Sequence, residues 1–304
     1  MKIGLIGAGR LGICLALLIE QEGYHVIASD VREDYINDLQ NKKINSTEPQ
    51  VQELLEHSIN LQFTTDNRKV IRESDVIFTL VQTPSLEDGS YDVSAVWEVV
   101  EDIKKEMSGI ANYPKSFVVG CTTNPGDCDQ FKDALPESVD VYYNPEFIAQ
   151  GSIVDDLRHA DMVLLGGKGQ HSGALEMMYY QIQNGFKVAN VHTMSTRAAE
   201  LTKIAVNCYL TTKITYANQV GQVMIRDGME DEVKTVLKAI GGDSRIGTKY
   251  LNYGFGFGGP CFPRDNRAFA CLLYTSPSPR DATLSRMPSW GLKKKRGGGG
   301  GGGG

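Results

Sequence analysis

A single cysteine lies in a loop whose residue types could do chemistry. The segment GFGFGGPCFPRD, residues 254–265, places Cys261 among glycines, with a proline on either side and Arg264 and Asp265 just after it. Glycines allow a polar ligand to approach the backbone closely. Cys261 could therefore be a nucleophile presented to a substrate, a metal ligand or an inert buried thiol, and the segment alone leaves these alternatives open.

Three polar residues upstream share one face of a predicted helix. Glu200, Lys203 and Asn207 fall at helical spacing, so that Lys203 and Asn207 are one turn apart. A lysine one turn from an asparagine can donate hydrogen bonds to a developing alkoxide. The same spacing is also typical of a solvated helix surface, and the sequence does not decide between the two.

A glycine motif follows the first apolar run and opens a helical pattern. In GAGRLG, Gly7 permits a tight turn, Gly9 lets a pyrophosphate approach the backbone, and Gly12 lets the helix pack close to the strand. Unpaired N–H groups at the start of this helix would face the phosphates. Asp30 closes the second apolar run, where a carboxylate would bind the adenosine ribose, which favours NAD over NADP although Arg32 is close by.

Polar residues also follow later apolar runs of the same domain. Thr83 lies in VQTP, Thr122 and Thr123 lie in CTTNPG, and Glu146 lies in NPEF. Ligands of open α/β sheets bind at the carboxyl ends of the strands. We therefore expect these side chains to lie at the same edge of the sheet as the glycine motif.

Apolar runs alternate with helical patterns over the first 195 residues, which predicts a doubly wound, Rossmann-like α/β domain with a parallel sheet covered on both faces. The predicted strands lie at 2–6, 24–30, 75–81, 116–122, 139–144 and 161–167.

Beyond residue 195 the pattern becomes helical. Ser195 and Thr196 are predicted caps of a helix over 197–226, and a second helix over 230–239 is ended by Gly241 and Gly242. We predict a boundary near residue 195, with an NAD-binding domain over 1–195 and an all-helical dimerisation domain over 196–270. The long helix is expected to pack against a second copy of the chain as a homodimer.

Composition excludes several classes of protein. The net charge is −6, with 41% hydrophobic and 22% charged residues, which argues for a globular protein and against a nucleic-acid partner. Near the start, the apolar run over 13–19 is too short to span a bilayer, and glycines with Arg10 interrupt a signal-peptide pattern. The six cysteines lack metal-binding spacing. We expect a cytoplasmic protein with no membrane partner and no metal.

The last 34 residues, 271–304, differ in character from the rest. They run CLLYTSPSPRDATLSRMPSWGLKKKRGGGGGGGG and show neither helical nor strand periodicity. Back-translation is compatible with a sequencing adapter followed by homopolymer runs, so we interpret this tail as read-through translation, with a genuine disordered tail as the alternative. The natural chain is then expected to continue differently after about Ala270, and sequencing of the genomic DNA would decide.

The order and spacing of these motifs carry a resemblance. GAGRLG, VQTP, CTTNPG, NPEFIAQGS, AELTKIAVN, DSRIG and GFGGPCFPRD together resemble the nucleotide-sugar 6-dehydrogenase family, the UDP-glucose and GDP-mannose dehydrogenases, over about residues 1–270. The resemblance implies a four-electron oxidation of a C6 alcohol to a carboxylate with two NAD, and UDP-glucose is the first choice of substrate.

The resemblance also implies residue roles. Cys261 would be the nucleophile, forming a thiohemiacetal and then a thioester, while Lys203 and Asn207 would stabilise the oxyanions. Asp265 would act with Lys203 on a water or proton, and Glu146 and Thr122 would position water and substrate. The implied cofactor-binding residues are Gly7, Gly9, Leu11, Gly12, Asp30, Thr83 and Thr122; the implied substrate-binding residues are Glu146, Phe147, Lys203, Asn207, Gly258 and Arg245, the last reaching the nucleotide sugar of a neighbouring subunit.

The sequence departs from the family pattern in places. Gln150 stands where many members have a second glutamate, Arg264 replaces the usual lysine before Asp265, and residues 160–162 lack the common Pro-Asp-Arg. The nucleotide-gripping C-terminal domain of the family is not expected in this chain, which is therefore predicted to be C-terminally truncated. Two alternatives stay open: a two-domain 3-hydroxyacid dehydrogenase, which needs no nucleophilic cysteine, and a dimeric NAD-binding fragment without catalytic activity.

Overall fold

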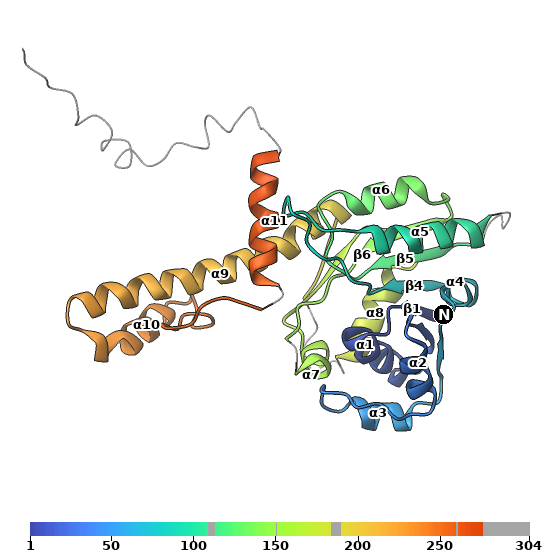
Figure 1. Ribbon diagram of the computed structural model, residues 1–304, viewed down its shortest axis with the longest axis horizontal. Coiled ribbons are helices and arrows are strands. Elements are labelled where there is room, and N and C mark those ends of the chain that lie inside the picture. Colours follow the sequence, from blue (N-terminus) through green and yellow to red (C-terminus); the bar gives the residue numbers. More distant parts are fainter. Residues whose placement is uncertain (109–112, 150, 184–189, 260, 276–304) are drawn as a thin grey trace, which may run out of the picture.

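One sheet organises the first two thirds of the chain (Figure 1). The computed structural model describes residues 1–108, 113–149, 151–183, 190–259 and 261–275. In these residues the sheet has the strand order β3-β2-β1-β4-β5-β6-β7-β8. The strands are β1 (Lys2–Ile6), β2 (His25–Ser29), β3 (Leu61–Thr64), β4 (Val76–Thr79), β5 (Lys115–Val119), β6 (Val139–Tyr143), β7 (Met162–Gly166) and β8 (Asn190–Met194).

The order of the first six strands is that of a doubly wound dinucleotide-binding fold, which confirms the predicted fold class. The crevice where such folds bind ligands lies between β1 and β4, which pair in parallel. The expectation of a wholly parallel sheet is wrong at one place, because β6 and β7 are antiparallel. They meet only at Tyr143 and Gly166, where a methyl group on Gly166 would lie 3.2 Å from the Tyr143 Cβ.

Helices cover both faces of the sheet, because alternate strand residues point to opposite sides. Two apolar clusters result: one gathers Leu5, Phe78 and Val118 with α1, α7 and α8, and the other gathers Ile77 and Phe117 with α4, α5 and α6. The helices of this domain are α1 (Arg10–Gln21), α2 (Glu33–Gln40), α3 (Val51–His57), α4 (Asn67–Glu73), α5 (Ser94–Met107), α6 (Asp127–Ala134), α7 (Ile153–Arg158) and α8 (Ser172–Ile182).

The second part of the chain is helical, as predicted. Helix α9 (Thr196–Arg226) starts against the sheet and extends well beyond it (Figure 1). Its predicted cap is confirmed, since the Ser195 hydroxyl accepts a hydrogen bond from the Ala198 backbone. The short helix η1 (Glu230–Glu232) and α10 (Val233–Gly241) fold back on the distal half of α9 through an apolar cluster that includes Met224, Leu237 and Leu251.

Helix α11 (Phe262–Thr275) crosses α9 close to the sheet domain (Figure 1). It follows directly on Cys261 and continues past Ala270, where the sequence analysis placed the last natural residue. The first residues of the expected tail, 271–275, therefore belong to this helix, and the Cys271 thiol donates to the Asp88 carbonyl at 2.6 Å. The origin of residues 271–304 and the domain boundaries stay predictions, and 276–304 lie outside the described residues.

Candidate active site

The glycine motif has the geometry that a bound dinucleotide requires. Gly7 has a φ of +98°, and a methyl group there would lie 2.7 Å from the Leu80 carbonyl oxygen. A methyl group on Gly12 would lie 2.1 Å from the Gly7 carbonyl oxygen, whereas one on Gly9 would meet nothing within 4 Å. Gly7 and Gly12 are therefore required by the fold, and Gly9 leaves open the space that a pyrophosphate would occupy.

The start of α1 is suited to phosphate. Its N-cap is Gly9, no side chain caps it, and no acidic residue lies in its first turn. The backbone N–H groups and the positive end of the helix dipole are therefore not capped by a side chain of α1 itself, while the carboxylate of Glu48 lies 4.0 Å from Arg10 Nε in this turn. Leu11 is half-buried in this first turn and packs against the core beneath it.

Asp30 lies just after β2, where the ribose of the cofactor is expected. Arg32 donates to both of its carboxylate oxygens, at 2.8 and 3.0 Å. Burial alone would raise the pKa of Asp30, but hydrogen bonds and charge from Arg32 outweigh this and hold it below its ordinary value. The carboxylate is therefore ionised at neutral pH and able to accept hydrogen bonds from a ribose diol.

Lys203 connects α9 to the loop after β6. Its ammonium group donates to the Glu146 carbonyl oxygen and lies 4.3 Å from the centre of the Phe147 ring. Burial lowers the pKa of Lys203, and the charges of Asp265, Cys261 and Glu146 oppose that shift. Lys203 thus lies near residues that are more than fifty positions away in the sequence on either side.

Glu146 has the electrostatic setting of an acid-base group. The Tyr179 hydroxyl of α8 donates to Glu146 Oε1 at 2.8 Å and lies equally within reach of Asn144 Oδ1. Burial raises the pKa of Glu146 to about 7, against the effects of Tyr179 and Lys203. A carboxyl group with such a pKa can both take up and release a proton near neutral pH.

Asp265 is held from two sides in the first turn of α11. Asn207 donates its amide to Asp265 Oδ2 at 2.6 Å, and the Tyr91 hydroxyl donates to Oδ1 at 2.7 Å. Only 1% of Asp265 is exposed. The pairing of Asn207 with Asp265 fits the predicted cluster, whereas Tyr91 was not predicted, because no motif marks a residue 174 positions away.

Cys261 is exposed at the entry to α11, in contrast to the buried Cys14, Cys121 and Cys128. The alternative of an inert buried thiol is therefore wrong. Within the described ranges, no group of three or more histidine, cysteine or acidic residues is placed to hold a metal ion. A thiol accessible to a substrate remains the interpretation that suits its position.

Glu200 is fully buried, so the alternative of a solvated face is wrong for this residue. Its carboxylate accepts hydrogen bonds from the Thr123 hydroxyl at 2.9 Å and from the backbone of Gly126 and Cys128 at 2.6 and 2.9 Å. Helix α6 starts here with a glycine cap that has no side chain. Glu200 supplies the missing acceptor and ties the CTTNPG loop to α9.

The remaining predicted residues lie in the loops after β4 and β5 and in the second part of the chain. Thr83 is buried after β4, and its carbonyl accepts a hydrogen bond from Arg264 at 3.0 Å. Thr122 is partly buried after β5. Gly258 is exposed in the loop before Cys261, and Arg245 is exposed and pairs with Asp243 at 2.6 Å. Gln150 lies outside the described residues.

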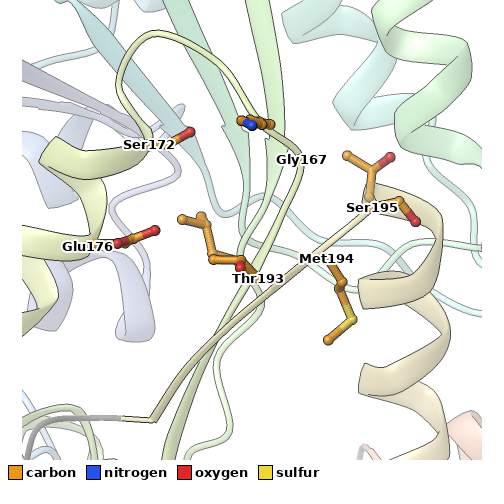
Figure 2. Close-up of a pocket in the computed structure, with 9 residues that line it drawn as sticks. Gly167, Ser172, Glu176, Thr193, Met194 and Ser195 are labelled. Atoms are coloured by element: carbon orange, nitrogen blue, oxygen red, sulfur yellow. The ribbon is translucent and has the colours of Figure 1, made fainter.

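A cavity of about 590 Å³ opens elsewhere, between the ends of β7 and β8 and the start of α8 (Figure 2). Gly167, Ser172, Glu176 and Thr193 are among its lining residues. None of the predicted catalytic residues lines it, so its size does not make it the reaction centre.

Comparisons with known proteins agree with this architecture. Residues 1–183 match the NAD-binding domain of the UDP-glucose/GDP-mannose dehydrogenase family, and residues 197–279 match its central domain. A UDP-glucose 6-dehydrogenase of Rhizobium meliloti is 32% identical over 279 residues, which cover 88% of this chain and 62% of that protein.

Two solved structures resemble the chain closely. A UDP-glucose dehydrogenase from Pyrobaculum islandicum has a TM-score of 0.81 and 28% identity, covering 90% of this chain and 64% of that one. A GDP-mannose dehydrogenase from Pseudomonas aeruginosa, solved as a ternary complex, has a TM-score of 0.70 and 26% identity, covering 90% and 65%. The chain thus spans somewhat less than two thirds of the length of these relatives.

Proposed function

Because the chain belongs to the UDP-glucose/GDP-mannose dehydrogenase family, we propose that it carries the NAD-binding and catalytic parts of an enzyme that oxidises the C6 alcohol of a nucleotide sugar to a carboxylate. The observation that carries this proposal is that Lys203 feels the charges of both the exposed thiol Cys261 and Asp265, and that Asp265 accepts a hydrogen bond from Asn207. UDP-glucose is the first candidate substrate.

The residues of the glycine motif fit NAD. Gly7, Gly9 and Gly12 shape the phosphate-binding turn, Asp30 faces the ribose position, and Thr83 lies at the end of β4. NAD, when bound, accepts a hydride in each of the two oxidation steps. The protein's own task is to orient the alcohol, hold the oxyanions and supply the covalent step.

Cys261 supplies the covalent step. Its thiolate sulfur adds to the carbon of the C6 aldehyde, forming a C–S bond while the carbonyl oxygen becomes an oxyanion. The ammonium of Lys203 and the second amide N–H of Asn207 stabilise that oxyanion; the first N–H of Asn207 is held by Asp265. Loss of a hydride from this thiohemiacetal carbon then leaves a thioester on Cys261.

Hydrolysis releases the product. Water adds to the thioester carbonyl, the C–S bond breaks, and the thiolate of Cys261 is regenerated. Glu146, with a pKa raised to about 7 by burial, suits the role of the base that takes a proton from this water, aided by Thr122, while Asp265 acts with Lys203. Overall, one alcohol, one water and two NAD give one carboxylate, two NADH and three protons.

A homodimer through α9 is part of the proposal. Tyr209, Tyr216 and Val223 lie seven residues apart on α9 and are 61, 47 and 53% exposed, respectively. Large apolar side chains repeated at this interval form a stripe that a second copy of the helix would cover. Arg245 is then proposed to reach the nucleotide sugar bound by the other subunit.

No helix within the described ranges combines the length and the apolar character needed to cross a membrane. The cytoplasmic location expected from the sequence remains part of the proposal.

Calorimetry separates the proposal from the alternative of a fragment that binds only NAD. Titration of the chain with NAD and then with UDP-glucose or GDP-mannose is expected to give heat of binding for NAD and for one nucleotide sugar. Heat of binding for NAD, without heat of binding for either nucleotide sugar, would support the fragment alternative. Family membership favours nucleotide-sugar oxidation over the 3-hydroxyacid alternative, which gives Cys261 no role.

A further inference from the structure

Tyr91 is a buried tyrosine whose hydroxyl reaches the proposed reaction centre. It lies in the loop between β4 and α5 and is 2% exposed. Burial, together with the charge of Asp265, raises its pKa, so the hydroxyl keeps its proton. The protonated hydroxyl donates a hydrogen bond to Asp265 Oδ1 at 2.7 Å.

Arg264 competes for the same oxygen. Its Nε lies 3.6 Å from Asp265 Oδ1, which is an ion-pair distance but longer than a charge-assisted hydrogen bond. Among the described residues, this Nε is buried without a hydrogen-bond partner. The Arg264 guanidinium lies 4.9 Å from the centre of the Tyr91 ring and donates a hydrogen bond to the Thr83 carbonyl. These two contacts keep Arg264 beside Asp265.

The hydrogen bonds of Asp265 affect which of the two nearby cations, Lys203 or Arg264, its negative charge stabilises. Burial disfavours the ammonium form of Lys203, and the charge of Asp265 is the first of the influences that support it, whereas Arg264 acts against it. If Arg264 closed on Asp265, less of this negative charge would remain for Lys203. The titratable and charged groups facing this pair are Tyr91, Glu146, Cys208, Cys261 and Arg264.

We propose that the Tyr91 hydroxyl is a positioning group for the reaction: it occupies Asp265 Oδ1, prevents Arg264 Nε from forming a hydrogen-bonded pair there, and so reserves the carboxylate for Asn207 and Lys203. This inference rests on the proposed function, in which Lys203 must be charged to stabilise the thiolate and the oxyanions. Tyr91 itself acts through Asp265 and does not touch the reacting atoms.

The variant Tyr91→Phe in the full chain tests the inference, because it removes the hydroxyl and keeps the ring on which Arg264 stacks. The rate at which iodoacetamide alkylates Cys261 is measured against pH by mass spectrometry of the peptide that contains this residue. The thiolate is the species that reacts, so the midpoint of this profile reports the positive charge near it. A residue that only supports the fold would leave the midpoint unchanged.

Lys203→Met provides the reference, since it removes the ammonium entirely and is expected to shift the midpoint to higher pH. Tyr91→Phe is expected to shift it in the same direction, by less than Lys203→Met does. The control Tyr24→Phe removes a hydroxyl that donates to Gln181 at 2.7 Å and is expected to shift nothing. A shift with Lys203→Met but none with Tyr91→Phe overturns the inference and leaves the proposed function intact. An unchanged midpoint with Lys203→Met contradicts the role of Lys203 in the proposed function.

A double variant isolates the part played by Arg264. If Tyr91 acts by excluding this guanidinium, Tyr91→Phe has no effect on the midpoint in an Arg264→Met background, and the two substitutions are strongly non-additive. The same shift in both backgrounds would overturn the competition between Tyr91 and Arg264.

Discussion

At the scale of single residues, the site depends on charged groups that have been taken out of water. The ammonium group of Lys203 donates to the backbone carbonyl of Glu146. Burial raises the pKa of Glu146 and lowers the pKa of Lys203. Burial thus favours the neutral form of both groups. These shifts also make the stability of the protein depend on pH.

Glu146→Gln tests this dependence. The pKa of Glu146 is raised from 4.5 to about 7 in the folded chain. Between these values the unfolded carboxyl loses its proton while the folded one keeps it, so the folded state binds more protons and its stability falls as the pH rises. Urea unfolding should show the wild type losing about 2 kcal/mol relative to Glu146→Gln between pH 4.5 and 7. A difference that does not change with pH would contradict the burial of a titrating carboxyl.

The sequence indicated which residues form the candidate site better than it indicated which of them contact each other. Lys203 and Asn207 were placed together because their spacing on a helix is local information. The burial of Glu200 could not be foreseen, since its three donors come from a loop more than seventy residues upstream, and charged residues are rarely fully buried. Tyr91 was missed for the same reason, because its partner Asp265 is adjacent only in the folded chain.

At the scale of elements, the turn between β1 and α1 separates glycines needed by the fold from one needed by the ligand. Gly12→Ala is expected to lower the free energy of unfolding by about 2 kcal/mol, because its methyl group would meet the Gly7 carbonyl at 2.1 Å. The methyl group of Gly9→Ala would meet no protein atom within 4 Å, so this variant should fold normally. It should nevertheless bind NAD at least about tenfold more weakly, because the methyl group blocks the pyrophosphate. Urea unfolding and calorimetry measure the two effects, and equal NAD affinity in Gly9→Ala and wild type would contradict this assignment.

The contact of α9 with the start of α6 is a second test at this scale. Glu200→Ala leaves the Thr123 hydroxyl and two backbone N–H groups buried without an acceptor, so we expect a loss of about 3 kcal/mol or more in the free energy of unfolding. The control Glu230→Ala removes an exposed glutamate and should change stability by less than about 0.5 kcal/mol. Equal losses in the two variants would show that Glu200 does not support the loop.

Which elements could be predicted follows from how much of their pattern is local. The six predicted strands are all present, because each is a clear apolar run, whereas β3 and β8 were missed. Most of β3 is only half-buried, and His192 and Thr193 of β8 are exposed, so their apolar signal is weak. The sequence pattern of β7 does not show that this strand is antiparallel to β6, because strand orientation depends on the path of the connection between strands.

At the scale of the whole molecule, the apolar stripe on α9 predicts assembly. Tyr216→Glu places a charge in the middle of that stripe and is expected to weaken the dimer at least about tenfold, as measured by sedimentation velocity. The control Ile59→Glu changes a side chain that is 87% exposed on the sheet domain, away from the stripe, and should leave the dimer intact. A monomeric wild type, or equal effects of the two substitutions, would contradict assembly through α9.

The yield of NADH and of sugar acid tests the proposal that Cys261 carries a nucleotide sugar through two oxidations. The chain is incubated with NAD and UDP-glucose, with GDP-mannose in parallel, and NADH and the sugar acid are quantified together. We expect two NADH for each acid formed by the wild type, and no acid from Cys261→Ala even though aldehyde and alcohol still interconvert. Acid formation by Cys261→Ala at the wild-type rate, or a wild type that binds NAD but oxidises neither sugar, would contradict it.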